Sequence, residues 1–466
     1  MTVAIRSWLA LAIIELVGAG TLTLLCSNLR RWALPARLGL SFGLGQVALT
    51  LWLFVASLLG FKPAWWLGVG ECAVLWMAVG TFCRRAASGW LEHSQATSSP
   101  DAPAWLRWFE CAAAVLLAST LLVVTAASVV EPLAEWDVVS FWALKAKVLL
   151  HEPLSSASYF VDPSKAYSQL DYPLLWPLTM AWIWAVVGKA DLQAIKWLTP
   201  AMLCAVAGAL YGLVRTGADR ARALLFTAVL FALPMQLSQT SRLSADVPFG
   251  FFVMASFACT YLWLRSGDEE NLKIAAPFAC GMLLTKNEGI GLFAVLVIAA
   301  TVTMATTPLR SRWRSASAWL VGVPLALAAP WLAFRMAIPK LNIDYASRID
   351  FRILAQNISW VSEVLLRSFT YFGDFADWLV FWPLLALVLL ITMTRSPRFE
   401  CMFLLTGLVL ALGAYGFAYV ITPWEIGEIM DSTANRLLLH LAPLSVFLMA
   451  ELTGTGRLLP WPMRAR

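Results

Sequence analysis

The residues with the clearest capacity for chemistry lie in one long polar interruption of an otherwise apolar chain, from Glu131 to Tyr172. The segment carries six acidic residues and three lysines, and Glu135-Trp-Asp137 lies near its start. A positioned carboxylate can act as a general base that takes a proton from an attacking hydroxyl, and Asp137 is the first candidate for this role. Aspartate is also a favoured helix N-cap, so a purely structural role for Asp137 stays open.

Three further acids could join Asp137. If the chain is extended at Glu135, its carboxylate points the same way as that of Asp137, and such a pair could share a proton or a cation; the alternative is a solvated loop acid. Asp246 is a candidate second acid facing Asp137, or a cap beside the proline that follows it. Asp171 lies two residues before a proline, which favours extended backbone just ahead of it. We interpret that place as a fixed turn, in which Asp171 is a second acid or a helix cap.

Five ionisable side chains elsewhere are candidates for holding an anion or contacting a substrate. Lys286 and Glu288 interrupt an apolar hairpin, where buried charge marks a functional cavity or a structural ion pair. Arg436 and His440 are four residues apart and therefore share one helix face. The planar guanidinium of Arg436 suits bidentate contact with a phosphate, and Lys286 and Arg348 are further candidates for that contact. The alternatives are contact with ordinary headgroups for Arg436 and an inert interior position for His440.

The stretch 138–150 is predicted to be an amphipathic helix. Apolar side chains recur at i, i+3 and i+7 from Phe141, which places them on one face. Lys145 and Lys147 are expected to extend towards lipid headgroups. Lys145 and Tyr172, together with Glu288 and His440, are candidates for substrate contact.

The composition predicts a membrane protein with many α-helical spans. Hydrophobic residues make up 60% of the 466 residues and charged residues only 13%, about half the charge of a soluble domain, which is roughly 25%. The apolar runs approach or exceed the roughly 20 residues needed to cross the hydrocarbon core. Clusters of arginine between these runs mark the cytoplasmic loops. They predict about thirteen crossings, with the N-terminus outside and the C-terminus inside, at 7–27, 38–60, 63–82, 109–130, 193–214, 222–238, 247–264, 274–285, 288–305, 316–337, 372–393, 399–421 and 435–451.

One apolar run breaks this alternation. Pro173 to Gly188 is short, contains Pro177 and ends without a basic cluster, so we interpret it as an interfacial helix anchored by its tryptophans, with an ordinary short span as the alternative. The large first outside loop therefore carries interfacial helices.

The expected organisation has four parts: residues 1–83 with additional N-terminal helices, a cytoplasmic linker at 84–108, a catalytic module at 109–305 with its outside loop at 131–192, and C-terminal helices at 306–466 that complete a cavity for a lipid donor.

The eight cysteines lie in or beside apolar runs and imply no disulfide framework. No glycine-rich nucleotide motif occurs, and the basic residues form no dense patch for nucleic acid. We found no internal repeat of the kind many transporters contain.

The ordered motifs of residues 109–300 resemble those of the GT-C membrane glycosyltransferases. They are Glu-Trp-Asp137, Phe-Trp-Ala-Leu-Lys-Ala-Lys147, Asp171-Tyr-Pro173-Leu-Leu, Ala-Asp246-Val-Pro and Leu-Leu-Thr-Lys286-Asn-Glu-Gly. The chain looks most like bacterial relatives of protein O-mannosyltransferases and of the aminoarabinose transferase, with a looser match of Arg436 to a late arginine. It departs from them in two ways: the acidic pair is not adjacent, since Trp136 separates Glu135 from Asp137, and three spans precede the matching module.

The resemblance implies an enzyme that moves a sugar from a polyprenyl-phosphate donor to an acceptor hydroxyl at the periplasmic face of the plasma membrane. It places Asp137 as the general base and implies inversion at the sugar. No cofactor is expected, and a divalent cation is possible but not required. The expected partners are the lipid-linked donor, membrane lipids and an acceptor lipid, glycan or protein. Two alternatives from other classes are a flippase for a lipid-linked glycan and a non-catalytic membrane subunit of an envelope assembly complex.

Overall fold

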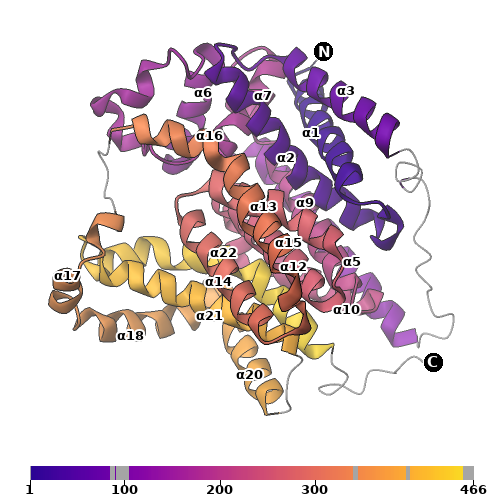
Figure 1. Ribbon diagram of the computed structural model, residues 1–466, viewed down its shortest axis with the longest axis vertical. Coiled ribbons are helices and arrows are strands. Elements are labelled where there is room, and N and C mark those ends of the chain that lie inside the picture. Colours follow the sequence, from indigo (N-terminus) through magenta and orange to yellow (C-terminus); the bar gives the residue numbers. More distant parts are fainter. Residues whose placement is uncertain (1, 84–89, 91–103, 340–344, 395–398, 455–466) are drawn as a thin grey trace.

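The chain forms a bundle of membrane-spanning helices. The computed structural model describes residues 2–83, 90, 104–339, 345–394 and 399–454, and these contain helices but no strand. Ten helices in these ranges are long and apolar enough to cross a membrane, and a bent helix pair makes up to eleven. The expected class, an all-α polytopic membrane protein, is confirmed (Figure 1).

The α-helices follow one another with short connections. Their bounds are α1 Val3–Leu25, α2 Leu34–Leu58, α3 Trp65–Phe82, α5 Ala104–Val130, α6 Leu144–His151, α7 Leu175–Val187, α8 Leu192–Ile195, α9 Leu198–Arg215, α10 Arg220–Phe231, α11 Pro234–Ser241, α12 Asp246–Ser266, α13 Glu269–Thr285, α14 Glu288–Ala305, α15 Trp313–Ser317, α16 Val323–Ala337, α17 Phe351–Gln356, α18 Trp360–Phe372, α19 Phe375–Trp378, α20 Phe381–Met393, α21 Phe399–Val420 and α22 Ile426–Thr453.

Three of the thirteen predicted crossings differ from simple spans. The run at 222–238 is split into α10 and α11, bent by 66°, because Pro234 starts a new helix. The run at 372–393 yields only the 13-residue α20, because the chain breaks after α19 at Leu379, which has a left-handed φ of 52°. The run at 274–285 belongs to the 17-residue α13, whose first turns are polar.

The centre of the bundle is α12, which packs against α13 and α22 (Figure 1). Every residue from Asp246 to Leu264 is buried. A helix that is apolar on all sides is stable only when other helices surround it, and α12 is largely apolar between its charged first turn and its last two residues. The first residue of α12 therefore brings a carboxylate into the protein interior.

Contacts at the two ends of α12 and α13 show that both helices cross the bundle. At one end Asp246 contacts Lys286. At the other end Asp268, in the α12–α13 turn, pairs with Arg31, and Arg265 pairs with Glu451. We call the end that contains Asp246 and Lys286 the site end; it gathers the segments that the arginine pattern predicts to be outside.

The helix α7 forms where a helix is predicted, but the expectation that its tryptophans anchor it at the membrane interface is wrong. Trp176, Trp182 and Trp184 are at most 2% exposed. Their indole N–H groups donate to the backbone carbonyls of Leu243, Ala10 and Asp191. The helix packs between α1, α2 and α6, so protein and not lipid surrounds its apolar surface.

The stretch after Asp137 is also helical, but its first part is a π-helical turn, Val138–Ala143, followed by α6. The wider turn rotates the following residues relative to an ideal α-helix. Lys145 consequently points inward and is fully buried, so the expected extension of Lys145 towards headgroups is wrong, whereas Lys147 is exposed.

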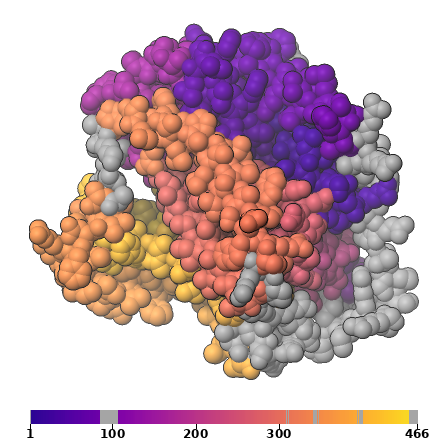
Figure 2. Space-filling model, in the orientation of Figure 1, coloured from indigo at the N-terminus to yellow at the C-terminus, as the bar shows by residue number. Residues whose placement is uncertain are grey.

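The first three helices are built into the bundle. Among their contacts, α1 packs on α2, α3 and α7, and α2 packs on α9 and α13. Most of the expected linker at 84–108 lies outside the described residues. At the other side of the molecule, α17, α18 and the adjoining ends of α21 and α22 form an arm, which a recess separates from α16 in the space-filling view (Figure 2).

Glycines allow a close backbone contact between α1 and α2. A Cβ on Gly45 would overlap the backbone carbonyl of Ile14, and a Cβ on Gly18 would overlap that of Ser41. Small residues at such positions let two membrane helices approach through their backbones. This contact fixes the N-terminal helices against the rest of the bundle.

We therefore predict that Gly45→Ala lowers the stability of the purified protein by about 2–3 kcal/mol, because backbone cannot move aside as a flexible side chain can. Thermal unfolding in detergent measures the effect. Gly70→Ala in α3 is the matched control, since a Cβ there meets no atom within 4 Å. Equal melting temperatures for the two variants would contradict the packing argument.

Candidate functional site

The site is organised around the carboxylate of Asp246, which is fully buried at the first turn of α12. Its Oδ1 contacts Lys286 Nζ at 2.5 Å and His440 Nε2 at 2.8 Å, and its Oδ2 accepts from Arg436 Nε at 2.8 Å and from Ser244 Oγ at 2.7 Å. A buried carboxylate is stable only with such partners, since charge without them is costly in the interior. The helix-cap alternative for Asp246 does not account for these four contacts.

The basic partners of Asp246 come from two separate places in the chain. Lys286 lies in the turn between α13 and α14 and also pairs with Glu288 at 3.1 Å. Arg436 and His440 come from adjacent turns of α22, and both contact Asp246, as their spacing of four residues allows. His440 Nδ1 contacts the hydroxyl of Tyr415 at 3.0 Å. A neutral imidazole that donates from Nε2 to Asp246 and accepts from Tyr415 satisfies both contacts.

Arg436 connects the buried carboxylate to the predicted base. Its Nη1 pairs with Oδ2 of Asp137 at 2.8 Å, while its Nε binds Asp246. The side chain of Asp137 is 27% exposed, and it makes no capping hydrogen bond to the helical turn that follows it. The structure therefore brings Asp137, Asp246, Lys286 and Arg436 together, although they are far apart in the sequence.

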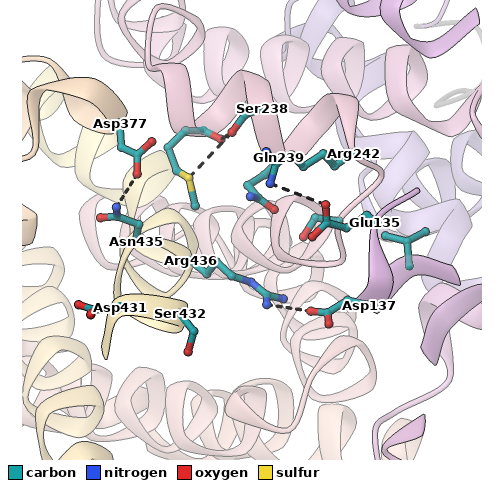
Figure 3. A pocket seen from close by; sticks show the side chains of 13 residues that line it. Glu135, Asp137, Ser238, Gln239, Arg242, Asp377, Asp431, Ser432, Asn435 and Arg436 are labelled. Carbon is teal, nitrogen blue, oxygen red and sulfur yellow. Dashed lines mark hydrogen bonds and ion pairs between the residues drawn. The ribbon is translucent and has the colours of Figure 1, made fainter. Parts of the chain in front are cut away.

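Asp137 and Arg436 open onto a polar cavity of about 310 Å³ (Figure 3). Acidic, amide and hydroxyl groups dominate its wall, together with two arginines. The lining residues are Glu135, Asp137, Val138, Met235, Ser238, Gln239, Arg242, Ser244, Asp377, Asp431, Ser432, Asn435 and Arg436.

The cavity has two chemically different sides (Figure 3). On one side lie Asp137 and Glu135, and Glu135 pairs with Arg242 at 3.7 Å. On the other side Asn435 donates to Asp377 and accepts from Trp378 Nε1 at 2.9 Å. Burial and the neighbouring Asp374 raise the pKa of Asp377 above its usual value. Glu135 and Asp137 thus have different basic partners, and the backbone between them is helical from Trp136 onward and not extended.

The remaining acid candidate, Asp171, lies in a neighbouring cluster. Its Oδ2 accepts from Asn287 Nδ2 at 3.0 Å and from Arg335 Nη2 at 3.2 Å. These contacts join the end of the polar loop to the α13–α14 turn and to α16. Asp171 is not among the residues that line the cavity.

Lys145 and Tyr172 lie next to each other, outside the lining of the cavity. The buried ammonium of Lys145 donates to the carbonyl of Gln169 and lies near the rings of Trp142 and Tyr172, at 5.6 and 5.9 Å from their centroids. Burial lowers the pKa of Lys145 to about 7. Neither residue lines the cavity.

Arg348 lies in the short helical turn Tyr345–Arg348, just before α17. Its guanidinium donates to the carbonyls of Ile421 and Thr422 at the end of α21, and it does not line the cavity. Within the described residues, no group of three or more His, Cys, Asp or Glu side chains is placed to hold a metal ion.

Sequence reasoning missed four residues of the site. Tyr415 and Ser244 complete the contacts around His440 and Asp246, and Arg242 and Asp377 line the cavity. Arg242 was visible as an arginine only four residues before Asp246. Tyr415 carries no local signal, because a tyrosine in an apolar helix is common.

The fold and this site together define a multi-pass α-helical membrane protein with a charge-lined cavity at one end of its spans. Comparison of the chain with protein-family models, with curated proteins and with solved structures gave no match in any of the three.

Removing the charge of Asp246 should destabilise the fold. We predict that Asp246→Asn lowers stability by about 3–5 kcal/mol, because Lys286 and Arg436 lose their buried counter-ion. The melting temperature of the purified protein measures this effect. Asp162→Asn is the control, since that carboxylate is 41% exposed and serves as a cap that asparagine can replace. A melting temperature for Asp246→Asn equal to that of the control would contradict the central role of Asp246.

Stability should also depend on pH through Lys145. Burial holds the pKa of Lys145 at about 7 in the folded protein, below the ordinary value of 10.5 for a lysine. Between these values the unfolded chain binds more protons than the folded protein, so stability rises as pH increases from about 7 towards 10.5. The Lys145→Met variant should lose this rise, which thermal unfolding between pH 7 and pH 9 can measure. Parallel pH dependence in both proteins would contradict a buried, weakly basic amine.

Proposed function

We propose that the protein is a glycosyltransferase that moves a sugar from a polyprenyl-phosphate donor to an acceptor hydroxyl at the outer membrane face. The observation that carries this proposal is the direct pairing of Asp137 with Arg436 at the wall of one polar cavity in a membrane protein. In this pair Asp137 can serve as the base for the acceptor hydroxyl, and Arg436 beside it can bind the phosphate of the donor. The resemblance of residues 109–300 to GT-C enzymes supports the same chemistry.

In the proposed reaction Asp137 takes the proton from the acceptor hydroxyl. The acceptor oxygen attacks the anomeric carbon from the face opposite the phosphate. A new C–O bond forms while the bond from that carbon to the phosphate oxygen breaks. The electron pair leaves with the polyprenyl phosphate, and the configuration of the sugar inverts.

In this proposal Arg436 stabilises the charge that develops on the leaving phosphate. A guanidinium has five N–H donors, and the ion pairs with Asp137 and Asp246 engage its Nη1 and Nε atoms. Cations held in place before the reaction stabilise developing negative charge without reorganisation. Asp246 is then a positioning residue, which acts by holding Arg436 at the cavity.

The size and polarity of the cavity suit the head of a lipid-linked donor and not its hydrocarbon tail. About 310 Å³ is at the lower end of ligand pockets, which span roughly 300–1,000 Å³. Carboxylates, amides and serine hydroxyls on its wall are groups that bind sugar hydroxyls. The tail would remain in the bilayer, which the apolar helices beside the cavity adjoin.

We predict that Asp137→Asn lowers kcat for transfer by at least about a hundredfold, which is the usual contribution of a general base. The amide has similar shape but cannot take a proton at neutral pH. Transfer of labelled sugar from a polyprenyl-phosphate donor to acceptors in a membrane extract measures the rate. Asp162→Asn, on the same loop, serves as the control.

Two results would count against the assignment. Undiminished transfer by Asp137→Asn would show that Asp137 is not the base. Movement of the donor across the membrane without any transfer by the wild-type protein would favour the flippase. Buried charges at Asp246 and Lys286 could belong to such a pathway, so both activities should be measured on the same preparation.

A further inference from the structure

We propose that Arg242 and Arg436 together form the phosphate-binding site of the cavity, and that Glu135 is the counter-ion that a phosphate displaces from Arg242. The ligand class rests on the proposed function: it is the phosphate group that joins the polyprenyl chain to the sugar. Arg242 thus becomes a binding residue, and Glu135 is not a second catalytic acid.

Arg242 and Arg436 are the only lysine or arginine side chains among the thirteen residues that line the cavity. Arg436 is firmly held, with two contacts of 2.8 Å. Arg242 is different: its side chain is 52% exposed, and its distance of 3.7 Å to Glu135 exceeds that of a hydrogen bond. A loose, exposed ion pair contributes little, so a phosphate can replace Glu135 at small cost.

Lys286, which the sequence favoured for this role, is less suitable. Its side chain is only 6% exposed, it contacts both Asp246 and Glu288, and it does not line the cavity. A phosphate could reach Lys286 only by breaking buried ion pairs, which is costly. Arg242 can supply a second cation without the breaking of any buried ion pair.

The backbone fixes the position of Arg242. It follows α11 directly and precedes Leu243, whose φ of 61° lies in the left-handed region that is unfavourable for leucine. The carbonyl of Leu243 accepts from the buried Trp176, and Ser244 binds Asp246. A strained turn held on both sides presents the arginine at a fixed point, while its side chain stays accessible.

The charges on the wall give the proposal a distinctive consequence. The lining contains the carboxylates of Glu135, Asp137, Asp377 and Asp431 against two arginines. Asp377 and Asp431 lie on the side away from Arg242 (Figure 3). Glu135, which pairs with Arg242, is therefore the acid expected to oppose an incoming phosphate. Removing the charge of Glu135 should strengthen phosphate binding.

The test measures binding of labelled polyprenyl phosphate to the full chain in nanodiscs. Arg242→Ala should weaken binding about tenfold or more, the effect of losing one charge-assisted contact. Glu135→Gln should tighten binding several-fold, because the competing carboxylate charge is removed. Arg352→Ala is the matched control, because this exposed arginine does not line the cavity. Competition with inorganic phosphate and with phosphatidylglycerol distinguishes the source of the phosphate.

Each possible result either supports the proposed phosphate site or overturns it. Wild-type affinity in Arg242→Ala overturns the proposal, and so does loss of transfer with unchanged binding in Glu135→Gln, which would make Glu135 catalytic. Equal competition by phosphatidylglycerol would overturn the assignment to a polyprenyl donor. If no acceptor is glycosylated but binding depends on Arg242 and Glu135 as expected, the phosphate site stands and the proposed transferase activity fails.

Discussion

The rest of the site depends on one interaction, the buried carboxylate of Asp246 with its basic partners. Asp246 lies at the end of the central helix, and its contacts come from the α13–α14 turn and from α22. Neither the acid nor the cations could stay charged in this interior alone, so each helix end requires the others in place. The ion pairs thereby align the ends of three spans that are distant in the sequence.

This alignment extends to the polar loop through two further contacts. Arg436 holds Asp137 at the start of the loop, and Asn287 holds Asp171 at its end. Arg436 on α22 binds Asp246 directly, and Asn287 follows Lys286 in the α13–α14 turn. A loop of about forty residues thus has both ends fixed to the same group of helices. Its carboxylate reaches the cavity wall with a defined position, which general base chemistry requires.

Local patterns in the sequence were sufficient for the class of fold and for several single placements. Apolar run lengths predicted the membrane helices, and the spacing of Arg436 and His440 predicted their shared face. The failures involve residues whose surroundings are set from far away. The tryptophans of α7 and Lys145 have the same amphipathic side chains whether they meet headgroups or other helices, and only the packed bundle decides. The pairing of Arg242 with Glu135 is likewise a contact between distant segments.

The three carboxylates around the two arginines differ mainly in how far water reaches them. The exposed fractions of Asp246, Asp137 and Glu135 are 0%, 27% and 39%, and their shortest ion-pair distances are 2.5, 2.8 and 3.7 Å. A fully buried carboxylate with all its contacts made, such as that of Asp246, can position cations but has no access to a substrate. A loosely paired, exposed one can be displaced at little cost. Of these three, only Asp137 combines a fixed position with access to the cavity. This difference in exposure and pairing supports the proposed roles, with Asp137 as the base, Asp246 as the positioning residue and Glu135 as the exchangeable counter-ion.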